Sequence, residues 1–135
     1  MSVKTLSTEI LKFAPFPQQG EIGCVIFSDH SISQMVISDK NEILLENEDM
    51  IGSFHSHPGN DAERFSPNDL ASALWGEEPE EITFLGSGYE LYYIQLKKLP
   101  KRVKLWISEY KSTGSRQILN NITREVNNRL KVIEY

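Results

Sequence analysis

Residues 54–58 read FHSHP, and residues 66–69 read SPND. Two of the three histidines of the chain lie in the first stretch, two positions apart. In a β-strand, side chains at positions i and i+2 leave the same face, so we expect His55 and His57 to direct both imidazoles towards one point. Pro58 ends ladder pairing and lets the chain turn back over that point. The stretch therefore predicts a strand that carries two ligands of a metal.

The second stretch has the composition of a helix start. Ser66 is a suitable N-cap, Pro67 suits the first helical position, and Asp69 stands where a capping-box acid would stand. This interpretation needs no metal. It is also compatible with one, because a helix that begins here would hold Asp69 rigidly on its first turn. We therefore predict that Asp69 is the third ligand, with its carboxylate directed back towards the histidines.

Two neutral imidazoles and one carboxylate are typical ligands of a catalytic Zn²⁺, which keeps a fourth position open for water. A structural zinc would normally have four protein ligands, often thiolates. The chain has one cysteine, Cys24, inside an apolar run, where we expect a buried thiol. Iron held by two histidines and one carboxylate is the chemical rival, and the spacing alone leaves it open.

A zinc hydrolase also needs a general base. Glu21 is our candidate, because it directly precedes the apolar run of residues 23–27 and would lie at a strand end that faces a cleft. The other carboxylates considered belong to the acidic stretch of residues 42–49, which has the composition of a solvated segment. The spacing alone favours Glu21 over these carboxylates only slightly.

The remaining pattern predicts an α/β (α+β) fold with a mixed central β-sheet flanked by helices. Apolar runs at 23–27 and 32–37 predict a strand hairpin, and those at 82–85 and 89–96 predict another around the turn at 86–88. The run at 89–96 has apolar residues at both its odd and its even positions, which indicates a central strand covered on both faces.

Helical spacing predicts two further elements. One helix runs on from Asp69 until Gly76 and Pro79 end it, and a second at 116–131 lays an apolar stripe on the sheet. Three segments are less clear. Residues 7–13 suit a short helix or an edge strand, residues 42–49 contain a further short strand, and residues 101–112 alternate like a strand without excluding a helix.

Composition limits the function. The 135 residues suit a single domain spanning 1–135, and the net charge of −5 argues against nucleic-acid binding. No apolar run is long enough for a membrane span or a signal peptide, so we expect a cytoplasmic protein with no membrane partner. The basic run at 97–104 is expected to be a solvated face, with a binding patch for an acidic partner as the alternative.

Taken together, EIGCVI at 21–26, HSHP at 55–58 and SPND at 66–69 resemble the JAMM signature of the JAB/MPN metallopeptidases. The likeness extends from about residue 20 to residue 97. It implies a cytidine-deaminase-like fold, zinc bound by His55, His57 and Asp69, Glu21 as the catalytic acid/base, and Ser66 as a donor to the oxyanion. The chain is most similar to compact prokaryotic members.

The resemblance further implies a peptidase or isopeptidase that acts at the C-terminal tail of a ubiquitin-like or sulfur-carrier protein. A smaller amide substrate stays open. The alternative is a catalytically silent MPN domain that serves as an interaction scaffold, for which loss of a ligand would be the mark. A homodimer through the helices or an exposed strand is also compatible with the sequence.

The spacing departs from the family pattern at one place. Relatives usually have seven residues between the second histidine and the serine, and this chain has the eight residues 58–65. A spacing of seven would place Asn68 at the acid position. We keep Asp69 because the S-x-x-D spacing is intact and one more loop residue costs little. Asp61, inside the loop, is the fallback ligand.

Overall fold

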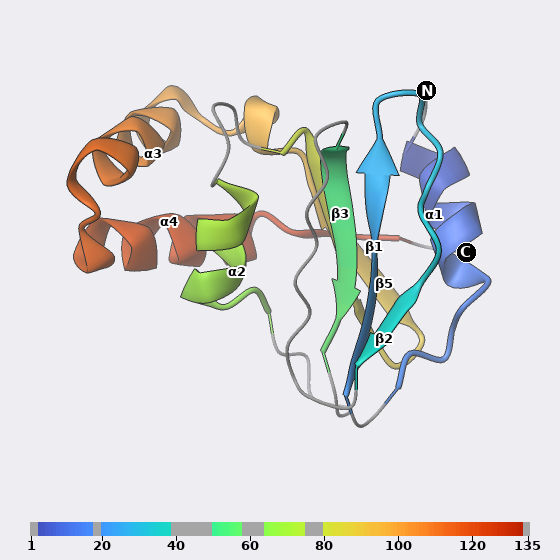
Figure 1. Cartoon of the computed structure of the whole chain (residues 1–135). Helices are drawn as coiled ribbons and strands as arrows, with labels where there is room; N and C mark the ends of the chain where they lie inside the picture. Colours follow the sequence, from blue (N-terminus) through green and yellow to red (C-terminus); the bar gives the residue numbers. More distant parts are fainter. Residues whose placement is uncertain (1–2, 18–19, 39–49, 58–63, 75–79, 134–135) are drawn as a thin grey trace.

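In the part of the chain that the structure describes, residues 3–17, 20–38, 50–57, 64–74 and 80–133, six strands form one mixed sheet. This computed structural model is drawn in Figure 1, where four helices flank the sheet. The predicted mixed α/β fold with a central sheet and flanking helices is confirmed. None of the described helices is long and apolar enough to cross a bilayer.

Helices and strands are interspersed along the chain. The strands are β1 (Glu21–Phe27), β2 (Val36–Ser38), β3 (Met50–Ser56), β4 (Ile82–Ser87), β5 (Glu90–Ile94) and β6 (Lys131–Val132), in the spatial order β2-β1-β3-β4-β5-β6. The helices are α1 (Val3–Leu11), α2 (Pro67–Ala73), α3 (Lys101–Thr113) and α4 (Arg116–Asn128), with a 3₁₀ turn at Leu96–Lys98. Strands β3 and β4 run parallel and every other neighbouring pair is antiparallel.

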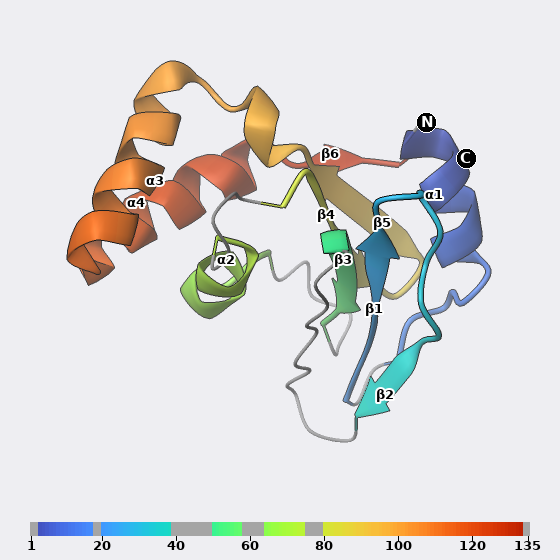
Figure 2. The ribbon, with the colours of Figure 1, turned by 45° about the horizontal axis from the view of Figure 1, so that its top comes forward.

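Alternating side chains of the sheet enter two separate cores. Phe54, Phe84 and Leu91 are fully buried on the side of α1. Their sequence neighbours Leu85 and Tyr92 face the opposite side, where they pack with α2, α3 and α4. Figure 2 shows α1 and α2 on opposite sides of the sheet. Because the pleat has a period of two, the residue that follows Phe54 necessarily faces the α2 side.

Both predicted hairpins are present, but the second strand of the first one is Val36–Ser38 and not residues 32–37, and the position of one strand in the sheet was wrong. Strands β1 and β2 pair antiparallel, and β4 and β5 are joined by a two-residue turn in which Gly88 adopts a φ of 58°. The second strand of that hairpin is covered on both faces, as expected. It is not central, however, because β3 and β4 occupy the middle and only the two-residue β6 lies outside β5.

The ambiguous segments are helices where they are described. Residues 7–13 belong largely to α1, and residues 101–112 form α3, in which Val103 and Ile107 are buried one turn apart while Leu105 is 60% exposed. Helix α4 ends at Asn128, and its stripe packs against α2 and α3 as well as the sheet. Helix α2 ends at Ala73 with Leu74 as its C-cap, before the predicted end at Gly76 and Pro79. Gly76, Pro79 and the expected strand within 42–49 lie outside the described residues.

The basic run at 97–104 is largely exposed, and it is partly neutralised within the chain. Lys97 Nζ lies 3.3 Å from Glu81 Oε1, and Arg102 Nη2 lies 2.9 Å from Glu125 Oε1. Exposed pairs of this kind contribute little to stability. The contacts agree with the predicted solvated face.

Gly52 lets the two central strands approach each other. It pairs with Ile82 at the start of the parallel β3–β4 ladder, and a Cβ atom at position 52 would lie 2.2 Å from the carbonyl oxygen of Ile82. A backbone atom cannot move aside as a flexible side chain can. The pairing of β3 with β4 therefore depends on glycine at this position.

We expect Gly52→Ala to lower the free energy of unfolding by about 3 kcal/mol, the upper end of the usual cost of overpacking. The matched control is Gly114→Ala, where φ is 69° and no atom lies within 4 Å of the added methyl group, so that only backbone strain of about 1 kcal/mol is expected. Urea unfolding of both variants checks this. A loss in Gly52→Ala no greater than that in Gly114→Ala would contradict it.

Candidate metal centre

His55 and His57 leave the same face of β3, as the spacing predicted. His55 pairs with Gly23 of β1 and with Leu85 of β4, and the backbone N–H of His57 donates to Gly86 O at 2.9 Å, which continues the ladder past the end of β3. Ser56 points the other way, is fully buried, and accepts from the backbone N–H of Ile22 at 3.0 Å. The histidine side chains are 14% and 8% exposed, so the pair is largely shielded.

A reciprocal capping box positions Asp69 at the start of α2. The backbone N–H of Asp69 donates to Ser66 Oγ at 3.1 Å, and the backbone N–H of Ser66 donates to Asp69 Oδ2 at 2.8 Å. Pro67 occupies the first helical position. The predicted helix start is confirmed at each of these residues. Since the box holds the backbone of Asp69 by one hydrogen bond and its carboxylate by the other, it also fixes what that carboxylate faces.

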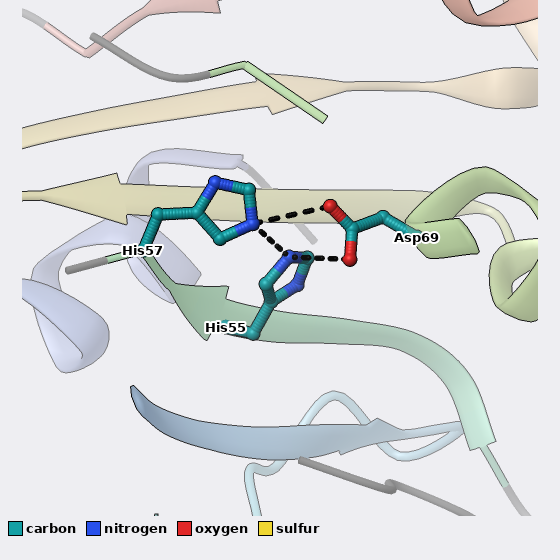
Figure 3. A group of neighbouring side chains, drawn as sticks. All are labelled: His55, His57 and Asp69. Atoms are coloured by element: carbon teal, nitrogen blue, oxygen red, sulfur yellow. Dashed lines mark hydrogen bonds and ion pairs between the residues drawn. The ribbon is translucent and has the colours of Figure 1, made fainter. Parts of the chain in front are cut away.

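The three side chains converge on one point, as Figure 3 shows. His55 Nε2 and His57 Nε2 are 3.2 Å apart, His57 Nε2 is 3.1 Å from Asp69 Oδ2, and His55 Nε2 is 3.4 Å from Asp69 Oδ1. Two bonds of about 2.0–2.1 Å at a tetrahedral angle would place the ligand atoms about 3.3–3.4 Å apart. The observed separations are close to these values. Among the described residues, His55, His57 and Asp69 form the group that can hold a metal ion.

The electrostatics of Asp69 favour its charged form. Burial raises the pKa of Asp69, but the hydrogen bonds to His55 and His57, the charge of His55 and the backbone N–H of Ser66 outweigh burial and hold that pKa well below its usual range. A ligand carboxylate must be ionised, so no proton has to leave it at neutral pH. Asp61, the fallback ligand, lies outside the described residues.

Glu21 lies beside the group without belonging to it. It is the first residue of β1, it is 7% exposed, and the β1–β3 register aligns Gly23 with His55. Continued by two residues, that register sets Glu21 opposite His57. Residues directly opposite each other in an antiparallel pair share a face, with Cβ atoms about 5 Å apart. The side chain of Glu21 therefore leaves the sheet on the same side as the two imidazoles.

Ser66 and Cys24 have clear structural roles. Ser66 Oγ accepts the capping hydrogen bond from Asp69, and within the described residues its own hydroxyl hydrogen is available as a donor. Cys24 is completely buried on the α1 side of the sheet, and burial raises its pKa to about 12. The expected buried thiol is confirmed, and a protonated thiol on the far face is no metal ligand.

The sequence did not identify three residues around the site. The Phe65 ring lies 5.6 Å from the His55 ring, and Asn127 of α4 bonds both the N–H and the carbonyl of Phe65, at 3.0 and 2.9 Å. Glu80 accepts hydrogen bonds from Ser53 and Thr83. Nothing in the sequence marks Asn127, and Glu80 belongs to an acidic run that has the composition of a solvated surface.

No family model matches the chain, and neither the curated proteins nor the solved structures gave a match.

We expect the purified protein to bind about one divalent metal ion per chain and Asp69→Ala to bind it more than about 100-fold more weakly, because a direct ligand should cost more than the 10–100-fold typical of outer-shell groups. Asp61→Ala is the matched control and should bind like the parent. Metal analysis and competition with a chromophoric chelator measure both. Full occupancy in Asp69→Ala, with loss in Asp61→Ala, would transfer the ligand role to Asp61.

The lowered pKa of Asp69 also predicts a pH-dependent stability in the metal-free protein. Its folded-state pKa lies below the unfolded value of about 4, so its stabilisation is fully present above that value and is lost as the pH falls below it. Asp69→Asn should therefore be less stable than the parent at pH 7, and the difference should shrink below about pH 4. Urea unfolding in the presence of chelator at several pH values tests this, and a pH-independent difference would contradict it.

Proposed function

We propose that this protein is a zinc-dependent hydrolase of the JAB/MPN (JAMM) type, with the cytidine-deaminase-like fold of that family, which cleaves a peptide or isopeptide bond. The observation that carries the proposal is the convergence of two imidazole nitrogens and one carboxylate at near-tetrahedral spacing. Three protein ligands are typical of catalytic zinc, and four are typical of structural zinc.

Zinc at these ligands would supply a coordinated water whose pKa is lowered to about 7. The protein supplies the rest. Glu21 starts on the same face of the sheet as His55 and His57, so its carboxylate is suited to take the proton of the attacking water and return it to the leaving amine. The free hydroxyl hydrogen of Ser66 is suited to bond the oxyanion that forms at the scissile carbonyl.

The substrate we propose is the C-terminal tail of a ubiquitin-like or sulfur-carrier protein, as the resemblance of the motifs implies, and a smaller amide is the alternative. Zinc is proposed over iron because the hydrolytic reaction needs no redox change of the metal. These assignments depend on the motif residues and their geometry together. A catalytically silent scaffold would be expected to lack a ligand, and all three ligand positions are filled here.

The decisive variant is Glu21→Gln, which keeps the size of the side chain and removes its basicity. We expect it to retain zinc at the parent's stoichiometry and to cleave a fusion to a ubiquitin-like protein about 10²–10⁴-fold more slowly, the usual contribution of a general acid/base. Glu9→Gln is the control, since Glu9 is exposed and pairs with Lys12 on α1.

Unchanged turnover in Glu21→Gln would remove Glu21 as the base. A zinc-loaded parent that cleaves neither protein fusions nor small amides would favour the scaffold.

A further inference from the structure

Glu80 places a second carboxylate on the face of the sheet that carries the metal ligands. Its Oε1 accepts from Ser53 Oγ at 2.6 Å and from Thr83 Oγ1 at 3.0 Å. Ser53 and Thr83 are paired across the parallel β3–β4 ladder. Ser53 precedes His55 by two residues, so both side chains leave the same face. The Glu80 carboxylate therefore lies one pleat away from His55.

The backbone around Glu80 is tied to both elements that supply ligands. The N–H of Glu80 donates to the carbonyl of Ala73, at the end of α2, at 3.1 Å. The N–H of Glu81 donates to the carbonyl of Ile51, in β3, at 2.7 Å. Helix α2 carries Asp69 and strand β3 carries His55. The position of Glu80 is thus defined relative to the metal centre by four hydrogen bonds.

Glu80 and His55 each have an unused polar atom. Within the described residues, the hydrogen bonds of Glu80 use Oε1 and leave Oε2 unpaired, and the polar contacts of His55 all use Nε2 and leave Nδ1 unpaired. Figure 3 shows that only one ring nitrogen of His55 faces Asp69 and His57. Burial raises the pKa of Glu80, and its hydrogen bonds to Ser53 and Thr83 and the nearby charge of His55 offset that rise only in part.

We propose that Glu80 is a positioning residue of the metal centre, whose carboxylate favours the proton on Nδ1 of His55 and so keeps the Nε2 lone pair directed at the metal. The proposal depends on the metal centre of the proposed function, and not on the reaction or the substrate. Metal-binding histidines generally direct their second ring N–H at a carboxylate, a carbonyl or water, which fixes the tautomer and the ring orientation. Here the unpaired carboxylate oxygen is the acceptor on the same face.

The variant that isolates this role is Glu80→Gln. The amide oxygen of glutamine can still accept from Ser53 and Thr83, which preserves the local structure, but its remaining group is a donor and offers no acceptor to Nδ1–H. Glu81→Gln is the matched control, because it removes the neighbouring carboxylate, which is exposed and pairs with Lys97 at 3.3 Å. Ser53→Ala is a second variant, since it keeps the carboxylate and removes one of the donors that hold it.

The experiment measures the affinity for Zn²⁺ and Co²⁺, the visible absorption of the Co²⁺ form and the melting temperature of the metal-free protein. We expect Glu80→Gln to melt like the parent, to bind both metals about 10–100-fold more weakly and to shift the Co²⁺ spectrum. Ser53→Ala should weaken binding by a smaller factor in the same direction. Glu81→Gln should match the parent in all three measurements.

Parent-like affinity and spectrum in Glu80→Gln would overturn the proposal. So would a lower melting temperature with unchanged affinity, because Glu80 would then act only as a clamp between α2 and β3. If Glu80→Gln fails to fold, Ser53→Ala decides, and unchanged affinity there has the same consequence. A parent that binds metal but hydrolyses nothing would refute the proposed reaction alone, whereas a parent that binds no metal would refute both.

Discussion

The carboxylate of Asp69 takes part in two structures at once. One of its oxygens closes the capping box at the start of α2, and the same carboxylate faces both histidines of β3. Helix start and candidate metal centre are therefore one arrangement of atoms. This sharing ties the start of the seven-residue helix α2 to the face of β3 that carries the histidines. It also means that the ligand is oriented before any metal arrives, which lowers the entropy lost on binding.

The candidate metal centre also depends on the register of β3, because the register decides which of its side chains face each side of the sheet. Phe54 and Ser56 are fully buried on the side of α1, and His55 and His57 between and beyond them face α2. A one-residue slip of this strand would exchange the two sets and bury imidazoles in an apolar core. The aromatic contact between Phe54 and Phe16, with ring centroids 5.2 Å apart, opposes such a slip. Packing on the α1 side of the sheet thus keeps the two histidines on the α2 side.

Short-range patterns in the sequence predicted the parts of the structure that depend on local geometry. The alternation of FHSHP and the cap at Ser66 each concern a few neighbouring residues, and both are confirmed. The turn expected at residues 86–88 lies one to two residues later, at 88–89, because Gly86 and Ser87 still pair within the β4–β5 ladder. What the sequence left open or did not predict depended on tertiary context. Val103, Leu105 and Ile107 alternate like a strand, but only the first and last are buried, one helical turn apart in α3. The order of strands, the contact of Asn127 with Phe65 and the place of Glu80 depend on residues far apart in the chain.

Asn127 of α4 holds the residue that enters α2. It bonds the backbone N–H and carbonyl of Phe65, while Ser66 and Asp69 hold the next turn. The position of Asp69 is thus set by α4 and by its own cap, and not by the number of residues that connect it to His57. The connection can lengthen during evolution without displacing a ligand, at a small entropic cost. Segments of different length inserted between His57 and Phe65 would then leave the three side chains in place, and a search pattern with a fixed spacing there would overlook chains that carry the same arrangement.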